Sequence, residues 1–586
     1  MIRLLAWLVA VVGVAAASAQ PLPASDTWWL LASGRFLAQT GQVVAPDPFS
    51  FTGTQWLNHE WLFALAAYEI HRVSSWEGLY LSRTLILVLA YALIPLFFVR
   101  KSVEASWAVS MLACLYAWLP PARFFYDVRP YLATYLLTAL TLALVRAYLA
   151  RPARSKLAAS VVLTALWANL HGAFILGPGI LLVAGLGCLL EKRRPQATEL
   201  GGAAVLALAA AVANPYGVAI LSFPFSLFGE SAFRLGLNEW VAPAMMGAHA
   251  WFWLVLVLGL GATGLHWRAG DRALALLTLA FLLGGLLAWR NLPLACLAGV
   301  QLHQVVLRAR AGLRLALLGL VLALELWWGW QRLTVPPARL GMWHTHFPMD
   351  AVSFLQANPE LPRRLVNPYE WGGWLAWHLP GWQIFIDGRA HTVYSEEVYL
   401  EALAIQLGGP WEKKAGVKWQ EILDLYKVDL VLATHLQGDL PRRLESSKEW
   451  ELVYSDSVAA VFLRRGSHHG PLRYPDTPSQ LIQKGLLLLQ VDQFEPAITC
   501  FRQAVQADPG RTRARLYLGV TMLQLGQPEG ADELEQALRL DPSLLEANYN
   551  LGLFYASQGD QQRARHHFQA ELRLNPGHAG ARQKLR

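Results

Sequence analysis

Long apolar segments alternate with short polar links through the first 333 residues of the chain. The segments lie at 4–19, 78–99, 105–120, 131–149, 157–170, 173–190, 198–213, 251–266, 273–289, 292–307 and 315–333. Several approach the ~20 residues that a helix needs to cross the hydrocarbon core of a bilayer. The pattern predicts a mainly α-helical, polytopic membrane bundle of about 11 spans over residues 1–335.

Basic residues are concentrated in alternate links between these segments. The basic links lie at 100–101, 146–156, 192–194, 268–272 and 308–314. Loops rich in Lys and Arg face the cytoplasm, so residues 20–77 and everything after about 334 are expected outside it. Ala17-Ser18-Ala19 also fits a signal-peptidase site, and cleavage there would leave ten spans with the same external loops.

The composition agrees with a membrane protein. Of 586 residues, 55% are hydrophobic and 15% are charged, and the mean hydropathy is +0.32. The net charge of +8 is explained by the cytoplasmic links, so no nucleic-acid partner is expected. The four cysteines lack metal-ligand spacing, which argues against a zinc site or a disulfide framework.

The pattern changes after residue 347. The stretches "QIFIDG", "VDLVLAT" and "SVAAVFLRR" predict strands, and 350–357 and 396–426 predict helices. We therefore expect a small extracytoplasmic α/β domain over 336–466 and a polar linker over 467–478.

The C-terminal region, 479–586, repeats itself about every 34 residues. Pro509, Pro542 and Pro576 recur at this interval, as do glycines in "YLGVTMLQLGQ" and "NLGLFYASQGD". The spacing resembles the tetratricopeptide repeat (TPR), which stacks as an α-solenoid. Such repeats mostly bind a protein partner, and a helical array without a partner is the alternative.

Polar side chains gather at the predicted external ends of the spans. They are Asp26, Trp28, Asn58, His59, Glu60, Asp127, Arg129, His171 and Arg290. Tryptophan at a membrane interface needs no further function, and a structural ion pair between Asp127 and Arg129 is the alternative for those two residues. Ionisable residues at membrane depth nevertheless indicate a functional site.

The layout resembles the GT-C superfamily of membrane glycosyltransferases. The resemblance rests on an early external Asp26 and on "DTWWLLASGRFLAQTGQVVAPDPFSFTGTQWLNHEWL", "DVRPYL", "LWANLHGAFILG", "NPYG", "RNLPL" and "WGGWLAWHLPGWQIFIDGR". These stretches are similar to a bacterial family of GT-C-like proteins that often end in TPRs. The resemblance implies an enzyme of the bacterial inner membrane, with its C-terminal domains outside the cytoplasm. It also implies that the donor is a polyprenyl-phosphate-linked sugar, so that a membrane lipid is a partner of the protein.

The resemblance assigns roles to the external residues. Asp26 is the first candidate for the general base, with Glu60 and Asp127 as reserve bases or as groups that orient the acceptor. Arg129 and Arg290 are candidate phosphate ligands, and His171 would bind phosphate or sugar. Substrate contacts are further expected from Trp28, Asn58 and His59. Because Thr27 and Trp28 follow Asp26, the chain lacks an Asp-x-Asp motif, and a divalent metal stays an open alternative.

Two functions from different classes fit these features. One is transfer of a sugar, or of a whole glycan, to an extracytoplasmic acceptor. The other is a non-catalytic membrane scaffold whose repeats recruit envelope-assembly partners. Convergence of Asp26, Asp127, His171 and Arg290 on one cavity favours the enzyme, and a close-packed apolar bundle favours the scaffold.

Overall fold

A computed structural model describes residues 2–19, 25–43, 46–53, 56–99, 101–119, 126–226, 250–302, 347–456 and 458–585. The chain forms two compact units. The first comprises Met1–Gln331 with Ile386–Leu400, and the second comprises Arg332–Phe385 with Glu401–Arg586. Residues 386–400, expected within the α/β domain, therefore belong to the helical unit. The predicted segment 315–333 lies outside the described residues.

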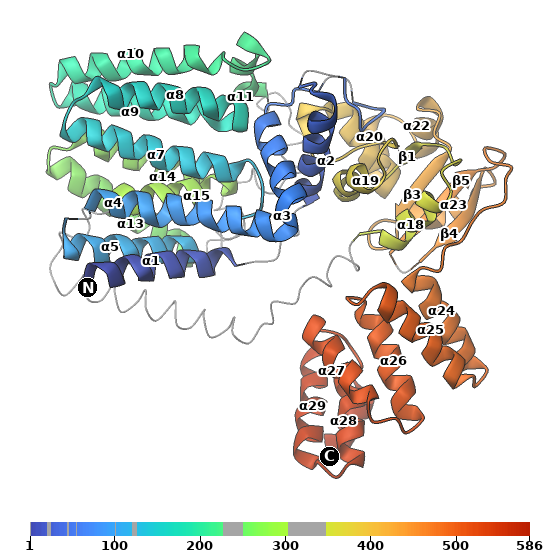
Figure 1. Cartoon of the computed structure of the whole chain (residues 1–586). Coiled ribbons are helices and arrows are strands. Elements are labelled where there is room, and N and C mark those ends of the chain that lie inside the picture. Colours follow the sequence, from blue (N-terminus) through green and yellow to red (C-terminus); the bar gives the residue numbers. More distant parts are fainter. Residues whose placement is uncertain are drawn as a thin grey trace. The chain divides into compact units, whose positions relative to one another are not determined.

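The first unit is helical. Its α-helices are α1 (Ile2–Ser18), α2 (Ser25–Thr40), α3 (Trp61–Val88), α4 (Ile94–Val99), α5 (Val103–Trp118), α7 (Tyr131–Ala150), α8 (Arg154–Leu170), α9 (Leu176–Leu190), α10 (Arg194–Ala211), α11 (Phe223–Ser226), α13 (Ala250–Arg268), α14 (Arg272–Leu287) and α15 (Leu292–Leu302). Helices α7 to α10 run side by side (Figure 1). Small residues also permit close packing between α9 and α14: a Cβ on Gly187 of α9 would lie 2.1 Å from Ala273 Cα of α14.

Within the described residues, three helical stretches are long and apolar enough to cross a membrane. They are Trp61–Val99, Tyr131–Ala150 and Gly172–Leu190. Shorter apolar helices lie at Ile2–Ser18, Val103–Trp118, Phe252–Arg268 and Arg272–Leu287. The 11-span bundle thus stays a prediction. The first stretch begins at Trp61 rather than near 78, because α3 begins there, and it reaches Val99 because α4 continues α3 through a π turn at Leu89–Leu93.

The second unit contains a five-stranded sheet in the order β2-β1-β3-β5-β4 (Figure 1). Its strands are β1 (Arg364–Val366), β2 (Gln383–Ile384), β3 (Leu430–Thr434), β4 (Trp450–Ser455) and β5 (Ala459–Arg464). β1 pairs in parallel with β2 and β3, whereas β5 pairs antiparallel with β3 and β4. The three predicted strands are confirmed. β1 and β4 were not predicted, since one has three residues and the other exposes Glu451 and Leu452 together.

Helices accompany the sheet in the same unit. They are α18 (Met349–Ala357), α19 (Gly372–His378), α20 (Glu396–Leu407), α21 (Pro410–Ala415), α22 (Trp419–Leu425) and α23 (Leu440–Glu445). The helices predicted at 350–357 and 396–426 are confirmed. α20 begins in the first unit and ends in the second.

The C-terminal helices pair into a stack (Figure 1). They are α24 (Pro478–Gln490), α25 (Phe494–Ala507), α26 (Thr512–Gln524), α27 (Gly530–Leu540), α28 (Ala547–Ser557), α29 (Gln561–Leu574) and α30 (Ala579–Leu585). The periodic glycines mark the contact within each pair. A Cβ on Gly485 would lie 2.4 Å from the Phe501 ring, and one on Gly552 would lie 2.5 Å from the Phe568 ring.

The linker before the repeats contacts the α/β module. Asn358 accepts a hydrogen bond from the Arg473 backbone N–H at 2.7 Å and donates to its carbonyl at 2.8 Å. The buried carboxylate of Asp350 accepts hydrogen bonds from Ser479 and Arg511. These contacts join the first repeats to the α/β module within the second unit.

Candidate functional site

A cavity of about 520 Å³ lies in the helical unit. Its polar side chains come from loops and helix ends and include Asp26, Trp29, His59, Glu60, His171 and Arg290. Its apolar side chains come from α9 and α14 and include Leu176, Ile180, Val183, Leu277 and Phe281. Leu176 and Val183 are about two helical turns apart, so the apolar wall extends well into α9. The cavity therefore offers both a charged surface and a hydrocarbon surface.

The structure brings five of the nine predicted site residues to this cavity: Asp26, His59, Glu60, His171 and Arg290. The lining does not include the other four, which are Trp28, Asn58, Asp127 and Arg129. Trp28 is buried edge-on against Trp76, with ring centroids 4.9 Å apart, and its described contact is packing.

Asp26 lies in the first turn of α2, where the helix dipole stabilises a carboxylate. Its Oδ2 forms an ion pair with Arg129. The neighbouring Thr27 hydroxyl donates to the Val128 carbonyl at 3.2 Å, which fixes the start of α2 against the "DVRP" segment. Arg129 therefore supports the cavity through Asp26.

Asp127 lies next to this pair. Burial raises its pKa, as does the nearby Asp26 carboxylate, whereas Arg129 and Arg83 lower it; the net shift is upward. Arg83 also donates to the Tyr126 carbonyl at 3.2 Å and to the Ser18 carbonyl at 2.7 Å. Arg129 thus forms an ion pair with Asp26 and also acts on the charge of Asp127.

Glu60 immediately precedes α3 and is buried between two histidines. Its Oε1 lies 3.0 Å from His59 Nε2 and 3.7 Å from His171 Nε2. Burial disfavours the charge on Glu60, but His59, His171 and Arg290 outweigh burial and hold its pKa below the ordinary value. Glu60 is therefore a carboxylate at neutral pH.

A chain of hydrogen bonds orients His171. Trp167 Nε1 donates to the Thr134 hydroxyl at 2.9 Å, and that hydroxyl lies 2.6 Å from His171 Nδ1. Burial lowers the pKa of His171 to about 4, so the ring is neutral at pH 7. If Thr134 donates to Nδ1, the ring proton is on Nε2 and faces Glu60. The opposite tautomer would place a lone pair against a carboxylate, so we assign the proton to Nε2.

Three sequence motifs meet in one hydrogen-bond network next to His59 and Glu60. Trp61 Nε1 donates to Asn169 Oδ1 at 3.0 Å, and Asn214 Nδ2 donates to the same oxygen at 3.3 Å. The Tyr216 hydroxyl accepts from the Asn58 backbone N–H at 2.8 Å and donates to the Val43 carbonyl at 3.1 Å. These hydrogen bonds hold Asn58 and Trp61, the residues on either side of His59 and Glu60 in the chain. The "LNHEW", "WANLHG" and "NPYG" motifs thus fix the position of Glu60.

Arg290 contributes a positive charge to the cavity. Its guanidinium lies over the Tyr131 ring, 4.7 Å from the centroid. Burial and the charge of Arg129 lower the pKa of Arg290 to about 9, although Glu60 and Asp26 raise it. Arg290 stays protonated at pH 7, and an anion in the cavity would relieve its repulsion with Arg129.

Arg389 also lines the cavity. Its guanidinium donates to Asp47 through two bonds, of 2.6 and 2.9 Å, and its Nε donates to Asp387 at 2.9 Å. All three side chains are at most 1% exposed. Arg389 therefore ties residues 386–400 to the loop at 46–53. No local pattern signals this pair, because its members are 342 residues apart.

Trp29 is a second lining residue that sequence reasoning missed as a site residue. Its indole Nε1 is buried and has no hydrogen-bond partner among the described residues. Tryptophan at a membrane interface needs no further function, so residue type alone does not single out Trp29. Its unpaired donor becomes visible only when the surrounding side chains are in place.

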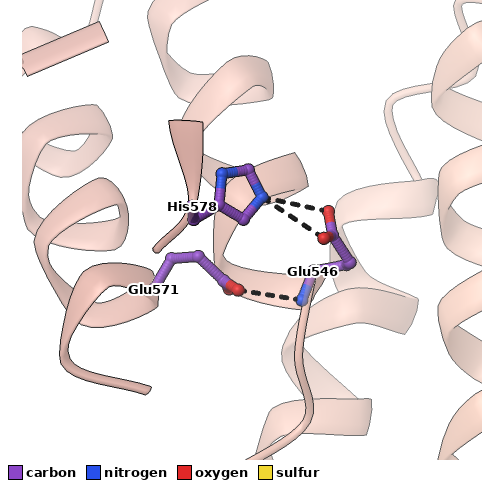
Figure 2. Close-up of side chains that lie close together, drawn as sticks. All are labelled: Glu546, Glu571 and His578. Atoms are coloured by element: carbon purple, nitrogen blue, oxygen red, sulfur yellow. Dashed lines mark hydrogen bonds and ion pairs between the residues drawn. The ribbon is translucent and has the colours of Figure 1, made fainter. Parts of the chain in front are cut away.

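Among the described residues, a group with metal-like spacing lies in the repeats rather than in the cavity. Ligand atoms of Glu546, Glu571 and His578 lie within 4.8 Å of one another (Figure 2). His578 Nδ1 accepts a hydrogen bond from the Ala581 backbone N–H at 3.1 Å, so the proton of the neutral ring is on Nε2. This nitrogen lies 3.3 Å from the Glu546 carboxylate. We therefore interpret the group as a hydrogen-bonded link between the last helices.

Comparison with known proteins confirms the repeats. Residues 482–544 and 528–579 match the tetratricopeptide repeat family, whereas no curated protein matches the chain in sequence. The repeats are similar in structure to YrrB, a TPR protein with an unusual peptide-binding site, at 22% identity and a TM-score of 0.18. That match covers 18% of this chain and 56% of the length of YrrB.

A larger part of the chain is similar to the oligosaccharyltransferase of Archaeoglobus fulgidus. The match to its apo form has 11% identity and a TM-score of 0.43, and it covers 73% of this chain and 69% of the enzyme. The match to its complex with Zn and sulfate has 12% identity and a TM-score of 0.42, and it covers 90% and 86%.

Proposed function

We propose that the protein is a membrane glycosyltransferase that transfers a sugar from a polyprenyl-phosphate donor to an extracytoplasmic acceptor. One observation carries the proposal: a single cavity joins carboxylates, a guanidinium and a long apolar wall. This combination suits a substrate with an anionic head and a hydrocarbon chain. A scaffold without catalysis has no need of buried charged groups around such a cavity.

The phosphate would bind at the charged surface. Arg290 offers a guanidinium that suits phosphate oxygens, and the repulsion between Arg290 and Arg129 favours an anion there. The polyprenyl chain would lie along Leu176, Ile180 and Phe281 of α9 and α14. His171, neutral and oriented through Thr134, would donate its Nε2–H to a phosphate or sugar oxygen.

The transfer needs a base and a leaving group. The acceptor oxygen attacks the anomeric carbon, the bond from that carbon to the phosphate oxygen breaks, and the acceptor proton passes to a carboxylate. Asp26 is the proposed base, and such a base contributes about 10²–10⁴-fold. Glu60, held by two histidines, would orient the acceptor or the sugar, and Asp127 would support Asp26 through Arg129.

The remaining parts of the proposal concern place and partners. The protein would reside in the bacterial inner membrane with residues 334–586 outside the cytoplasm, and the repeats would bind a protein partner. A reporter that works only in the cytoplasm, fused near His469, should be inactive. Metal dependence would be tested by adding a chelator to the transfer assay.

The decisive experiment uses the full chain purified in detergent. Binding of undecaprenyl phosphate is measured by native mass spectrometry, and consumption of radiolabelled polyprenyl-phosphate sugars is measured in membranes. Asp26→Asn should bind the lipid and lose transfer, whereas Arg290→Ala should weaken lipid binding. Glu69→Gln is the control, because Glu69 forms an exposed pair with Arg72. Full transfer by Asp26→Asn would remove Asp26 as the base, and a wild-type chain without lipid binding would overturn the proposal.

A further inference from the structure

The apolar part of the cavity lies between two helices that diverge from a shared contact. α9 and α14 touch where Gly187 meets Ala273, since a Cβ on Gly187 would lie 2.1 Å from Ala273 Cα. Away from this contact, residues between 176 and 183 of α9 and between 277 and 285 of α14 line the cavity. The two helices are therefore antiparallel, and the space between them opens from the contact toward Arg290, which also lines the cavity.

Gly179 lies at one edge of this space. It lines the cavity together with Ile180 and Val183 of the same helix, whereas Leu182 and Leu186 are exposed on the outer face of α9. At about 100° per residue around a helix, Gly179 falls between these two faces. A Cβ on Gly179 would have no described atom within 4 Å, so helix packing does not require a glycine at this position.

Ala280 occupies the equivalent edge on α14. It lines the cavity with Leu277 and Phe281, and it is itself exposed. Leu283 and Leu287 are exposed on the outer face of α14, and the same helical geometry places Ala280 between that face and the cavity face. The cavity wall thus reaches the outer surface of the helical unit at a small side chain.

The two edges lie at the same level. Gly179 is eight residues from Gly187, and Ala280 is seven residues from Ala273, which places them about 12 and 10 Å from the shared contact along the helix axes. Small residues therefore border the space between the helices on both sides, next to exposed leucines. Because a membrane presents only hydrocarbon to such an outer surface, an opening at this level would join the cavity to the bilayer.

We propose that the cavity opens toward the bilayer between Gly179 and Ala280, and that the hydrocarbon chain of the donor leaves through this opening. The phosphate stays at Arg290, and the adjoining part of the chain lies along the wall between Leu176 and Val183. That wall is about 10 Å long, whereas the hydrocarbon core of a bilayer is ~30 Å thick, so the rest of a long chain lies among the lipids. The donor class is then a prenyl phosphate whose length beyond the first isoprenoid units does not matter. This inference rests on the proposed glycosyltransferase function.

Cysteine labelling tests the opening in the full chain in detergent. Ala280→Cys is treated with benzyl methanethiosulfonate, and wild type reports the background because its four cysteines are buried. Undecaprenyl phosphate and its short analogue citronellyl phosphate, each at about ten times its Kd, should both slow the modification about tenfold. Inorganic phosphate has no chain and should leave the rate unchanged. Leu206→Cys on α10 is the control, because Leu206 is exposed and outside the cavity lining.

Filling the opening tests the same inference without a thiol reagent. Gly179→Leu should weaken the binding of both prenyl phosphates about tenfold or more, as measured by native mass spectrometry, because the new side chain occupies the space of the donor chain. Gly202→Leu is the matched control and should bind as wild type. A Cβ on Gly202 of α10 likewise meets no described atom within 4 Å, and Gly202 does not line the cavity.

Four results would overturn the inference. They are a prenyl phosphate that binds without slowing the modification of Ala280→Cys, equal slowing by inorganic phosphate, wild-type affinity of Gly179→Leu for both prenyl phosphates, and failure of citronellyl phosphate to compete with undecaprenyl phosphate. If wild type binds undecaprenyl phosphate and transfers sugar while one of these results is obtained, the inference fails and the glycosyltransferase function stands. If wild type binds no lipid phosphate and transfers no sugar, both fail.

Discussion

Arg389→Met removes the cation shared by Asp47 and Asp387. In wild type the guanidinium donates to both oxygens of Asp47 and to Asp387, and it also contacts the Phe49 and Trp56 rings at 5.2 and 5.3 Å. Methionine retains much of the side-chain length but offers no donor. The variant therefore leaves two buried carboxylates facing each other.

The cost follows from burial. Removing one partner of a buried ion pair costs about 3–5 kcal/mol, and Arg389 serves two carboxylates that are at most 1% exposed. Each 1.4 kcal/mol is about a tenfold change in an equilibrium constant. The loop at 46–53 should therefore open about 10²–10⁴ times more often in the variant.

Hydrogen–deuterium exchange of the full chain measures this opening. The informative amides include Phe49 N–H, which donates to Asp47 Oδ1 at 3.1 Å, and Tyr394 N–H, which donates to the Ala390 carbonyl at 2.9 Å. Their exchange should accelerate, whereas amides in the repeats should not change. Arg72→Met is the control, because its pair with Glu69 is 59% and 40% exposed and such pairs contribute about 0–1 kcal/mol.

A double variant separates loss of charge pairing from loss of packing. Adding Asp47→Asn to Arg389→Met removes one of the two stranded charges and should recover part of the protection. Exchange in Arg389→Met that stays within about twofold of wild type would show that the buried pair does not hold the loop, and the reasoning from burial would be wrong.

Thr134→Val should lower the free energy of unfolding by about 2–4 kcal/mol, because it leaves Trp167 Nε1 and His171 Nδ1 without a partner. Thr141→Val on the same helix removes a hydroxyl that has no hydrogen-bond partner among the described residues, so thermal unfolding should be unchanged or improved, and equal losses in both variants would contradict the network. The lowered pKa of His171 means that the unfolded chain takes up a proton between pH 6.5 and about 4 that the folded chain refuses. The free energy of unfolding should therefore decrease by about 3 kcal/mol in wild type as the pH falls from 6.5 to about 4, and by less in His171→Gln, as melting curves against pH would show. Zn²⁺ should leave the melting of the repeats unchanged; a stabilisation that disappears in Glu571→Gln, whose Oε2 has no hydrogen-bond partner in the described structure, would instead identify a metal site.

Local patterns in the sequence determined much of the architecture. A 34-residue period identified the repeats, and the structure explains it by glycines such as Gly485 and Gly552 that allow the paired helices to touch. Apolar runs identified most helices of the first unit, and short runs rich in Val, Ile, Leu and Phe identified three of the five strands. These features are readable because helix, strand and repeat periodicities depend on neighbours along the chain.

The candidate site was only partly readable. Residue type and position near helix ends pointed to Asp26, Glu60, His171 and Arg290, and all four line the cavity. Their partners were not readable: Arg129 pairs with Asp26, and His59 with His171 encloses Glu60. Which charges neutralise one another depends on how the helices pack, which no single segment encodes.

The tertiary structure alone decided what closes the cavity. It brings Gly388 beside Asp26 and Trp29, and it buries Arg389 between Asp47 and Asp387. Residues 387–389 lie more than 300 residues along the chain from Asp26, Trp29 and Asp47, as the 342-residue separation of Asp47 and Arg389 illustrates. A close backbone approach, an unpaired donor and a buried ion pair are properties of packed neighbours in space, so sequence periodicity carries no trace of them.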